Sequence, residues 1–254
     1  MAIELIPIVI ILAFVLEFFD SAVGMGYGTT ITSTLLLLGF APLRVIPSVL
    51  FTNMILGITA ALFHHGFKNV NFHPKSRDLK VTMFLFAFGL IGVIIAVIVA
   101  IRLPENVLRT YIGCLVLVIG IFVLLTRHHK IKFSWKGLVG FGTLAAFNKG
   151  MTAGGYGSVL VGGQMLSGIE GKKAIGVAVL TEGLLSLVAV LGYHFINGGI
   201  DVNWSLVISL LIGGLLSLPI AAYVVKKFHP KRLRFTIGIV NIILGTAILT
   251  RFVL

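Results

Sequence analysis

Long apolar stretches separated by short polar ones follow one another along almost the whole chain. Six of them reach the roughly 20 residues that a membrane-spanning helix needs, namely Val45–Phe63, Val81–Ile101, Leu108–Thr126, Ala174–Phe195, Ser205–Val225 and Phe235–Val253. Four others are shorter or interrupted, namely Ile3–Phe19, Thr29–Gly39, Trp135–Phe147 and Tyr156–Ser167. This pattern predicts an all-α polytopic membrane protein.

The order of short and long segments occurs twice, five segments at a time. Matching residues follow the same order in both halves: Gly26-Tyr27-Gly28 with Gly155-Tyr156-Gly157, Gly39 with Gly168, Thr52 with Thr181, Leu108–Gly113 with Leu233–Gly238, and Gly120 with Gly245. Because each copy has an odd number of segments, the second copy crosses the bilayer in the opposite orientation. We therefore predict two inverted repeats, 1–126 and 137–254, joined by a basic cytoplasmic linker, 127–136.

Basic residues gather on one side of this predicted topology. Four connecting segments hold 15 of the 20 Lys and Arg residues, namely His64–Lys80, Arg127–Lys136, Lys172–Lys173 and Lys226–Arg234. Lys and Arg are enriched in cytoplasmic loops of membrane proteins. This side is therefore predicted to be cytoplasmic, and both termini are predicted to lie outside the cell.

Each repeat opens with two short segments around a Gly-Tyr-Gly tripeptide. Trp135–Phe147 would give about 20 Å of helix, whereas the hydrocarbon core is about 30 Å thick. We therefore expect a re-entrant or broken-helix hairpin at the start of each repeat. Irregular backbone at membrane depth is tolerated where protein or a water-filled cavity meets it.

A helix that begins at such a break offers free N–H groups and a partial positive charge to an anion. The predicted substrate-binding residues are Gly26, Tyr27, Gly28, Thr29, Thr30, Lys149, Gly155, Tyr156, Gly157 and Ser158. A second interpretation is that the glycines only allow helices to pack closely, since Gly24 and Gly28 have the four-residue spacing typical of such contacts.

Four ionisable residues fall inside predicted membrane segments: Glu17, Asp20, Lys149 and Glu182. Such residues are costly in lipid and usually mark a transport pathway. Asp20 and Lys149 occupy equivalent positions in the two repeats, which allows two hypotheses. They pair across the pseudo-twofold axis, or Lys149 holds an anionic substrate while Asp20 or Glu17 carries a proton. Glu182, which aligns with Asn53, is the third candidate proton carrier, and helix–helix contact is an equal alternative for Glu17 and Glu182.

The composition excludes several other classes of protein. Of the 254 residues, 58% are hydrophobic and 11% charged, against roughly 25% charged in soluble domains. The net charge of +12 lies at membrane boundaries, so we expect no nucleic-acid partner. Cys114 has no partner for a disulfide, and the histidines lack a carboxylate or thiolate cluster, so no metal or cofactor is predicted. No nucleophile motif or Walker loop is present, and the protein is not expected to be an enzyme.

Glycine-rich motifs in both halves also carry a family resemblance. These are Gly24–Gly28 with Val45–Ser48, and Ala153–Gly157 with Lys172–Gly176. In their order and spacing the chain resembles the TauE/SafE family of sulfite and organosulfonate transporters over nearly its whole length. The resemblance implies secondary transport of small sulfur-containing anions in a prokaryotic plasma membrane, with the substrate in the glycine-rich hairpins. Many members place a proline soon after the first glycine cluster, where this chain has Thr29–Thr34, so no particular sulfonate is carried over.

Three functional hypotheses follow. The first is a secondary transporter of small anions such as sulfite, sulfoacetate or taurine, working by alternating access, with proton coupling as an option. The second is an anion channel, which would share the site but need a continuous pore. The third is a cation-coupled or proton-coupled carrier of another substrate. The expected partners are the anion and the lipid bilayer, and the sequence is compatible with a homodimer.

Overall fold

The structure is a computed structural model that describes residues 5–126, 135–166, 169–196, 198–199, 202–227 and 231–252. All regular structure in these ranges is α-helical. The helices are α1 (Pro7–Val23), α2 (Tyr27–Leu37), α3 (Pro42–Gly66), α4 (Arg77–Arg102), α5 (Glu105–Thr126), α6 (Trp135–Thr152), α7 (Tyr156–Leu166), α8 (Gly171–Ile196), α9 (Trp204–Lys227) and α10 (Lys231–Phe252). The predicted all-α class is confirmed.

The long helices coincide with the six predicted spans. Among the described residues, α3, α4, α5, α8, α9 and α10 are long and apolar enough to cross a membrane. Each of these helices contains one of the apolar stretches predicted to span the membrane. The last residue of the stretch in α10, Val253, lies outside the described residues. Helix α6 begins at Trp135, so residues 135–136 of the predicted linker belong to this helix, and residues 127–134 lie outside the described ranges.

Two short helices follow breaks in the backbone. Helices α2 and α7 have 11 residues each, about 16 Å of helix, which is half of a hydrocarbon core. The first break has positive φ at Gly24 (76°) and Gly26 (124°), and the second has it at Ala153 (60°) and Gly155 (84°). Glycine adopts this conformation without a Cβ clash, whereas Ala153 adopts it at some cost. The two breaks therefore have similar backbones.

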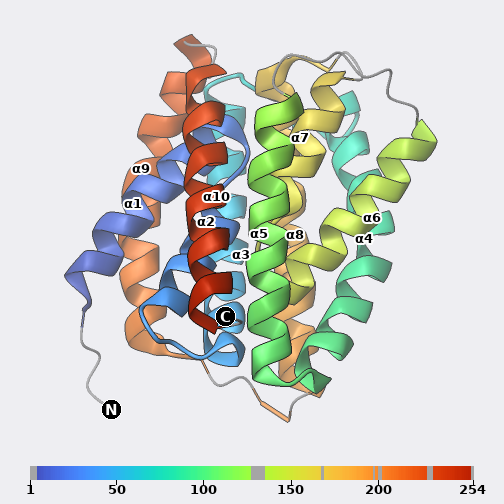
Figure 1. The fold of residues 1–254 in the computed structure, drawn as a ribbon. Helices are drawn as coiled ribbons and strands as arrows, with labels where there is room; N and C mark the ends of the chain where they lie inside the picture. The colour runs from blue at the N-terminus through green and yellow to red at the C-terminus, as the bar shows by residue number, and fades with distance from the viewer. Residues whose placement is uncertain are drawn as a thin grey trace.

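The helices pack in pairs that run through the whole bundle (Figure 1). Helix α1 lies along α9 and α4 along α6, while α3 lies along α8 and α5 along α10. Glycine lies at each of these interfaces: a Cβ on Gly213 would come within 2.1 Å of the Ile10 carbonyl oxygen, and one on Gly92 within 2.3 Å of that of Thr143. Small residues let helix backbones approach closely where no hydrophobic effect drives association.

The connections between helices gather at two opposite ends of the bundle. At one end, Arg109 Nη2 donates to the Phe40 carbonyl oxygen at 3.3 Å, and Arg251 donates to that of Leu37. At the other end, Asn69 Nδ2 donates to the Ala222 carbonyl oxygen at 2.9 Å and ties the α3–α4 loop to α9. The breaks lie between these ends, inside the bundle.

Candidate functional site

The two helix breaks lie directly against each other. A Cβ on Gly28 would be 2.0 Å from the Ala153 carbonyl oxygen, and one on Gly157 would be 2.1 Å from that of Gly24. A Cβ on Gly154 would be 2.4 Å from the Thr29 nitrogen. Only glycine fits where backbone meets backbone this closely. In this conformation the glycines therefore serve close packing, one of the two interpretations that the sequence left open, and their role in binding substrate stays a prediction.

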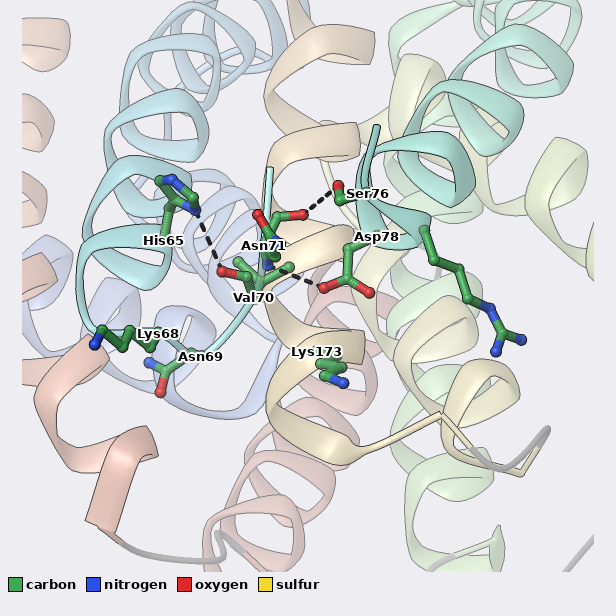
Figure 2. A pocket seen from close by; sticks show the side chains of 9 residues that line it. His65, Lys68, Asn69, Val70, Asn71, Ser76, Asp78 and Lys173 are labelled. Carbon is green, nitrogen blue, oxygen red and sulfur yellow. Dashed lines mark hydrogen bonds between the residues drawn. The ribbon is translucent and has the colours of Figure 1, made fainter. Parts of the chain in front are cut away.

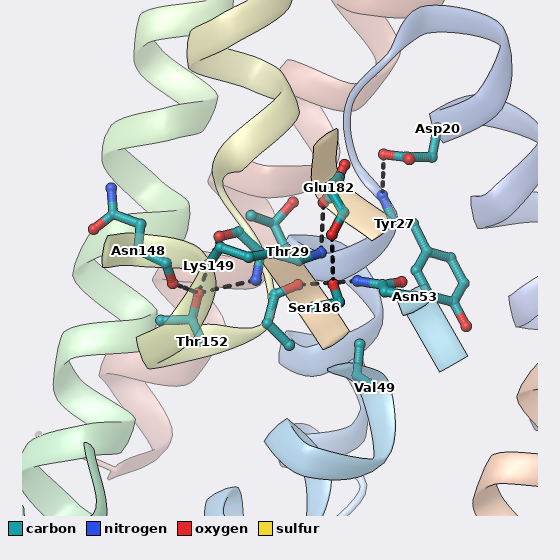
Figure 3. A network of polar contacts seen from close by, with 12 residues as sticks. Asp20, Tyr27, Thr29, Val49, Asn53, Asn148, Lys149, Thr152, Glu182 and Ser186 are labelled. Carbon is teal, nitrogen blue, oxygen red and sulfur yellow. Dashed lines mark hydrogen bonds and ion pairs between the residues drawn. The ribbon is translucent and has the colours of Figure 1, made fainter. Parts of the chain in front are cut away.

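A buried ion pair lies beside the second break (Figure 3). Lys149 Nζ lies 2.6 Å from Glu182 Oε1, and the two residues are 0% and 8% exposed. Lys149 is in the last turn of α6, where the helix dipole favours a cation. Its partner is thus Glu182 of α8, and the hypothesis that Lys149 pairs with Asp20 is wrong for this structure.

The equivalent place beside the first break carries a carboxylate. Asp20, in the last turn of α1, accepts the backbone N–H of Tyr27 through Oδ1 at 3.0 Å. That N–H is in the first turn of α2 and has no partner within its own helix. The hydrogen bond therefore closes the break between α1 and α2.

A third carboxylate, Glu17, lies one turn before Asp20 and is 3% exposed. It interacts electrostatically with Asp20, Glu182 and Lys149. Neither Glu17 nor Asp20 makes an ion pair with any residue that the structure describes. Three buried carboxylates thus lie in a region with one buried lysine, which is an expensive arrangement unless protons neutralise part of the charge.

These carboxylates border a small cavity. It is lined by Glu17, Asp20, Asn53, Leu56, Gly57, Val179 and Glu182. It offers about 10 Å³ to the centre of a water-sized sphere, which is room for about one water molecule. The centre is polar and almost closed in this conformation.

The other predicted site residues are buried, apart from the half-buried Gly26. Thr29 Oγ1 donates to the Gly26 carbonyl oxygen at 3.1 Å, and Thr30 Oγ1 donates to Asn241 Oδ1 of α10 at 3.0 Å. Thr30 is therefore engaged in a helix–helix contact here. The structure places Gly155 and Ser158 at the start of α7 and gives neither a polar side-chain partner in the interactions described.

Tyr27 and Tyr156 begin the two short helices, and both are almost completely buried. Neither hydroxyl makes a hydrogen bond of normal geometry within the described part of the chain. Thr52 lies beside the first hydroxyl and Thr181 beside the second. Both rings are therefore packed inside the bundle at the breaks, and neither is part of the lining of the central cavity.

Comparison with known proteins agrees with this architecture. Residues 9–248 match the family described as sulfite exporter TauE/SafE. The chain belongs to this family. It is 30% identical over 234 residues to the probable membrane transporter protein YtnM of Bacillus subtilis (strain 168), which covers 87% of this chain and 75% of that protein. No solved structure matches. Both matches support membrane transport as the general function.

Asn53 lines the central cavity and was not assigned to the site from the sequence. Its side-chain Nδ2 donates to the Ala153 carbonyl oxygen at 3.2 Å, so α3 is hydrogen-bonded to the second break. Its alignment with Glu182 in the sequence was the available signal, and both residues line the central cavity. Ser186, whose Oγ donates to the Glu182 carbonyl oxygen at 2.7 Å, gave no such signal.

Proposed function

We propose that this TauE/SafE chain is a secondary transporter of small anions, with sulfur oxyanions and sulfonates as substrates, and that it couples transport to protons by alternating access. The observation that carries the proposal is the Lys149–Glu182 pair with two further buried carboxylates beside it. A lysine held at membrane depth suits an anionic substrate, and carboxylates without a cation suit a proton.

The proposal includes two inverted repeats that meet at their breaks. The pairing of the helices supports this. If each of the first five helices is exchanged with its counterpart five places later, the α1–α9 pair becomes the α6–α4 pair, which is also observed. The α3–α8 and α5–α10 pairs are exchanged into themselves. The short helices α2 and α7 support re-entrant hairpins. We place the basic end on the cytoplasmic side of a prokaryotic plasma membrane, with both termini outside.

The ion pair suggests how the proton and the anion are coupled. While Glu182 is ionised, it neutralises Lys149, and an anion arriving at Lys149 would have to displace it. A proton on Glu182 removes this competitor and leaves the ammonium group free for the anion. Proton and anion would therefore bind together, and the occupied site would carry no more charge than the empty one when the anion is monovalent.

The anion would also need room. A cavity for one water is too small for a sulfonate, so substrate binding requires the two breaks to separate. Their separation would expose the first N–H groups of α2 and α7, which are suited to an oxyanion. A closed centre that must open toward one side at a time is what alternating access requires.

The test uses purified protein and a panel of sulfite, sulfate, thiosulfate, sulfoacetate, taurine, acetate and nitrate. A ligand at 100 times its Kd should stabilise the fold by about 2.7 kcal/mol, and we expect this from a sulfur-containing anion. Lys149→Gln should abolish the shift in unfolding temperature, whereas Lys149→Arg should retain part of it. An unchanged response in Lys149→Gln would remove Lys149 from the site.

Proteoliposomes then distinguish the modes of transport. A carrier should give saturable counterflow of the stabilising anion, faster when the outside is acidified. Unitary currents would show a channel instead. Acidification without effect on uptake would contradict proton coupling while leaving anion transport standing.

A further inference from the structure

A second and much larger pocket opens at the basic end of the bundle (Figure 2). Its volume is about 510 Å³, within the range of small-molecule sites. It lies between the α3–α4 loop and the start of α8, and its lining is His65, Lys68, Asn69, Val70, Asn71, Ser76, Arg77, Asp78 and Lys173.

The pocket is positively charged. Three cations, Lys68, Arg77 and Lys173, line it together with one carboxylate, Asp78. Asp78 Oδ2 accepts the Asn71 backbone N–H at 2.9 Å, so part of its hydrogen-bonding capacity is used by the loop. Nearby Glu170 lies 3.0 Å from Lys172 and 3.8 Å from Lys173, so it interacts more closely with the lysine outside the pocket.

The walls of the pocket are held in place by side-chain contacts. His65 Nδ1 accepts the Phe72 backbone N–H at 3.2 Å, and Ser76 Oγ donates to the Asn71 carbonyl oxygen at 2.6 Å. Lys68 has a φ of 62°, which a residue with a side chain rarely adopts. These contacts give the loop a concave shape, and the side chains of Lys68, Arg77 and Lys173 are exposed around it.

The same two helices that border this pocket lead to the closed centre. Helix α3 contributes His65 to the pocket and Asn53 to the central cavity, and α8 contributes Lys173 and then Val179. Lys173 and Val179 are six residues apart, about 9 Å along the helix. Val70 lies between, with its side chain 2.6 Å from where a Cβ on Gly176 would be. The Val70 side chain thus packs against α8 about one turn beyond Lys173.

We infer that this pocket binds small oxyanions and is the mouth through which they pass between the basic end and Lys149. The passage of anions to Lys149 rests on the proposed function, whereas the binding of anions in the pocket does not. Clustered cations raise the local concentration of anions, and with it the rate of their encounter, by 10-fold to 1,000-fold.

A labelling experiment tests the binding without transport. In a Cys114→Ser background, which removes the one cysteine of the sequence, Asn71→Cys places a thiol in the pocket. His73→Cys, in the same loop but outside the lining, is the matched control. Each thiol is treated with anionic sulfonatoethyl methanethiosulfonate and with its cationic trimethylammonioethyl counterpart. The ratio of the two rates cancels any difference in thiol reactivity between the positions.

We expect this anionic-to-cationic ratio to be about tenfold higher at Asn71→Cys than at His73→Cys. Adding Lys173→Gln or Lys68→Gln should lower it severalfold, and ethanesulfonate should slow labelling at residue 71 only. Equal ratios at the two positions, or protection by anionic phospholipid but not by ethanesulfonate, would overturn the inference.

Transport measured on the same variants separates the two proposals. Lys149→Gln should abolish uptake and leave the labelling ratio unchanged, because Lys149 is remote from the mouth. Lys173→Gln should raise the KM for the anion severalfold with little change in maximal rate. A normal KM in Lys173→Gln with a high labelling ratio in the parent would make the pocket an anion site off the path, and so overturn its role as the mouth.

Discussion

The two helix breaks are built alike and charged differently. Both begin with a residue of positive φ, Gly24 in one and Ala153 in the other, and both lead into an 11-residue helix. Yet the first break is preceded by Asp20, and the second by Lys149. The breaks thus share a backbone conformation and differ in the charge of the residue that precedes them.

A hydrogen bond to the backbone near each break is made by a different type of side chain in the two halves. His64 Nε2 lies 2.9 Å from the Ser21 carbonyl oxygen near the first break, and the Tyr193 hydroxyl donates to the Gly150 carbonyl oxygen at 3.0 Å near the second. An imidazole and a phenol thus hold equivalent backbone positions. Different side chains thus make the same kind of contact to the backbone near each break, just as Asp20 and Lys149 differ at the centre.

The largest effect is expected where the second break loses its cation. Lys149→Met should lower the free energy of unfolding by about 3–5 kcal/mol, because it leaves Glu182 buried without a partner. Denaturant titration of the purified protein measures this. Lys149→Met combined with Glu182→Leu should recover most of the stability but no anion response. A double variant as unstable as the single one would show that the pair is not what holds α6 against α8.

Next come the glycines at which the breaks touch. Gly28→Ala and Gly157→Ala should each cost about 1–3 kcal/mol or more, since the added Cβ meets a backbone carbonyl that cannot move aside. Similar losses in both halves are expected, because the close approach is reciprocal. Gly66→Ala is the control, as nothing lies within 4 Å of its Cβ position. If the unfolding temperatures of Gly28→Ala and Gly157→Ala equal that of the Gly66→Ala control, the two breaks separate easily and their close contact does not stabilise the fold.

The smallest effect on stability is expected at the first break. Asp20→Asn should change the free energy of unfolding by less than about 1 kcal/mol, because an amide oxygen still accepts the Tyr27 N–H. Proton-driven uptake in proteoliposomes should nevertheless fall, since an amide side chain does not bind and release a proton as a carboxylate does. Stability as low as that of Lys149→Met would instead show that the Asp20 charge is structural.

The spans were predictable because length and apolarity alone define them. Each of α3, α4, α5, α8, α9 and α10 contains an apolar stretch long enough for lipid, whatever its neighbours. The breaks were predictable for a similar reason, since Gly-Tyr-Gly interrupts an apolar segment twice. Such features are local to the sequence.

The partner of Lys149 was not predictable in this way. Glu182 lies on a different helix, 33 residues farther along the chain, and its rotation toward α6 depends on how α8 packs against α3 and α4. The contact of Gly28 with Ala153 likewise depends on how the two halves are placed against each other, which no local pattern determines. Tertiary packing therefore decided both the ion pair and the use of the glycines.

The near absence of space at the centre has a consequence for the cell. Protons cross membranes readily along files of hydrogen-bonded water, and a chamber that holds a single molecule interrupts any such file. In this conformation the buried ionisable groups therefore border a cavity too small to hold a continuous file of water.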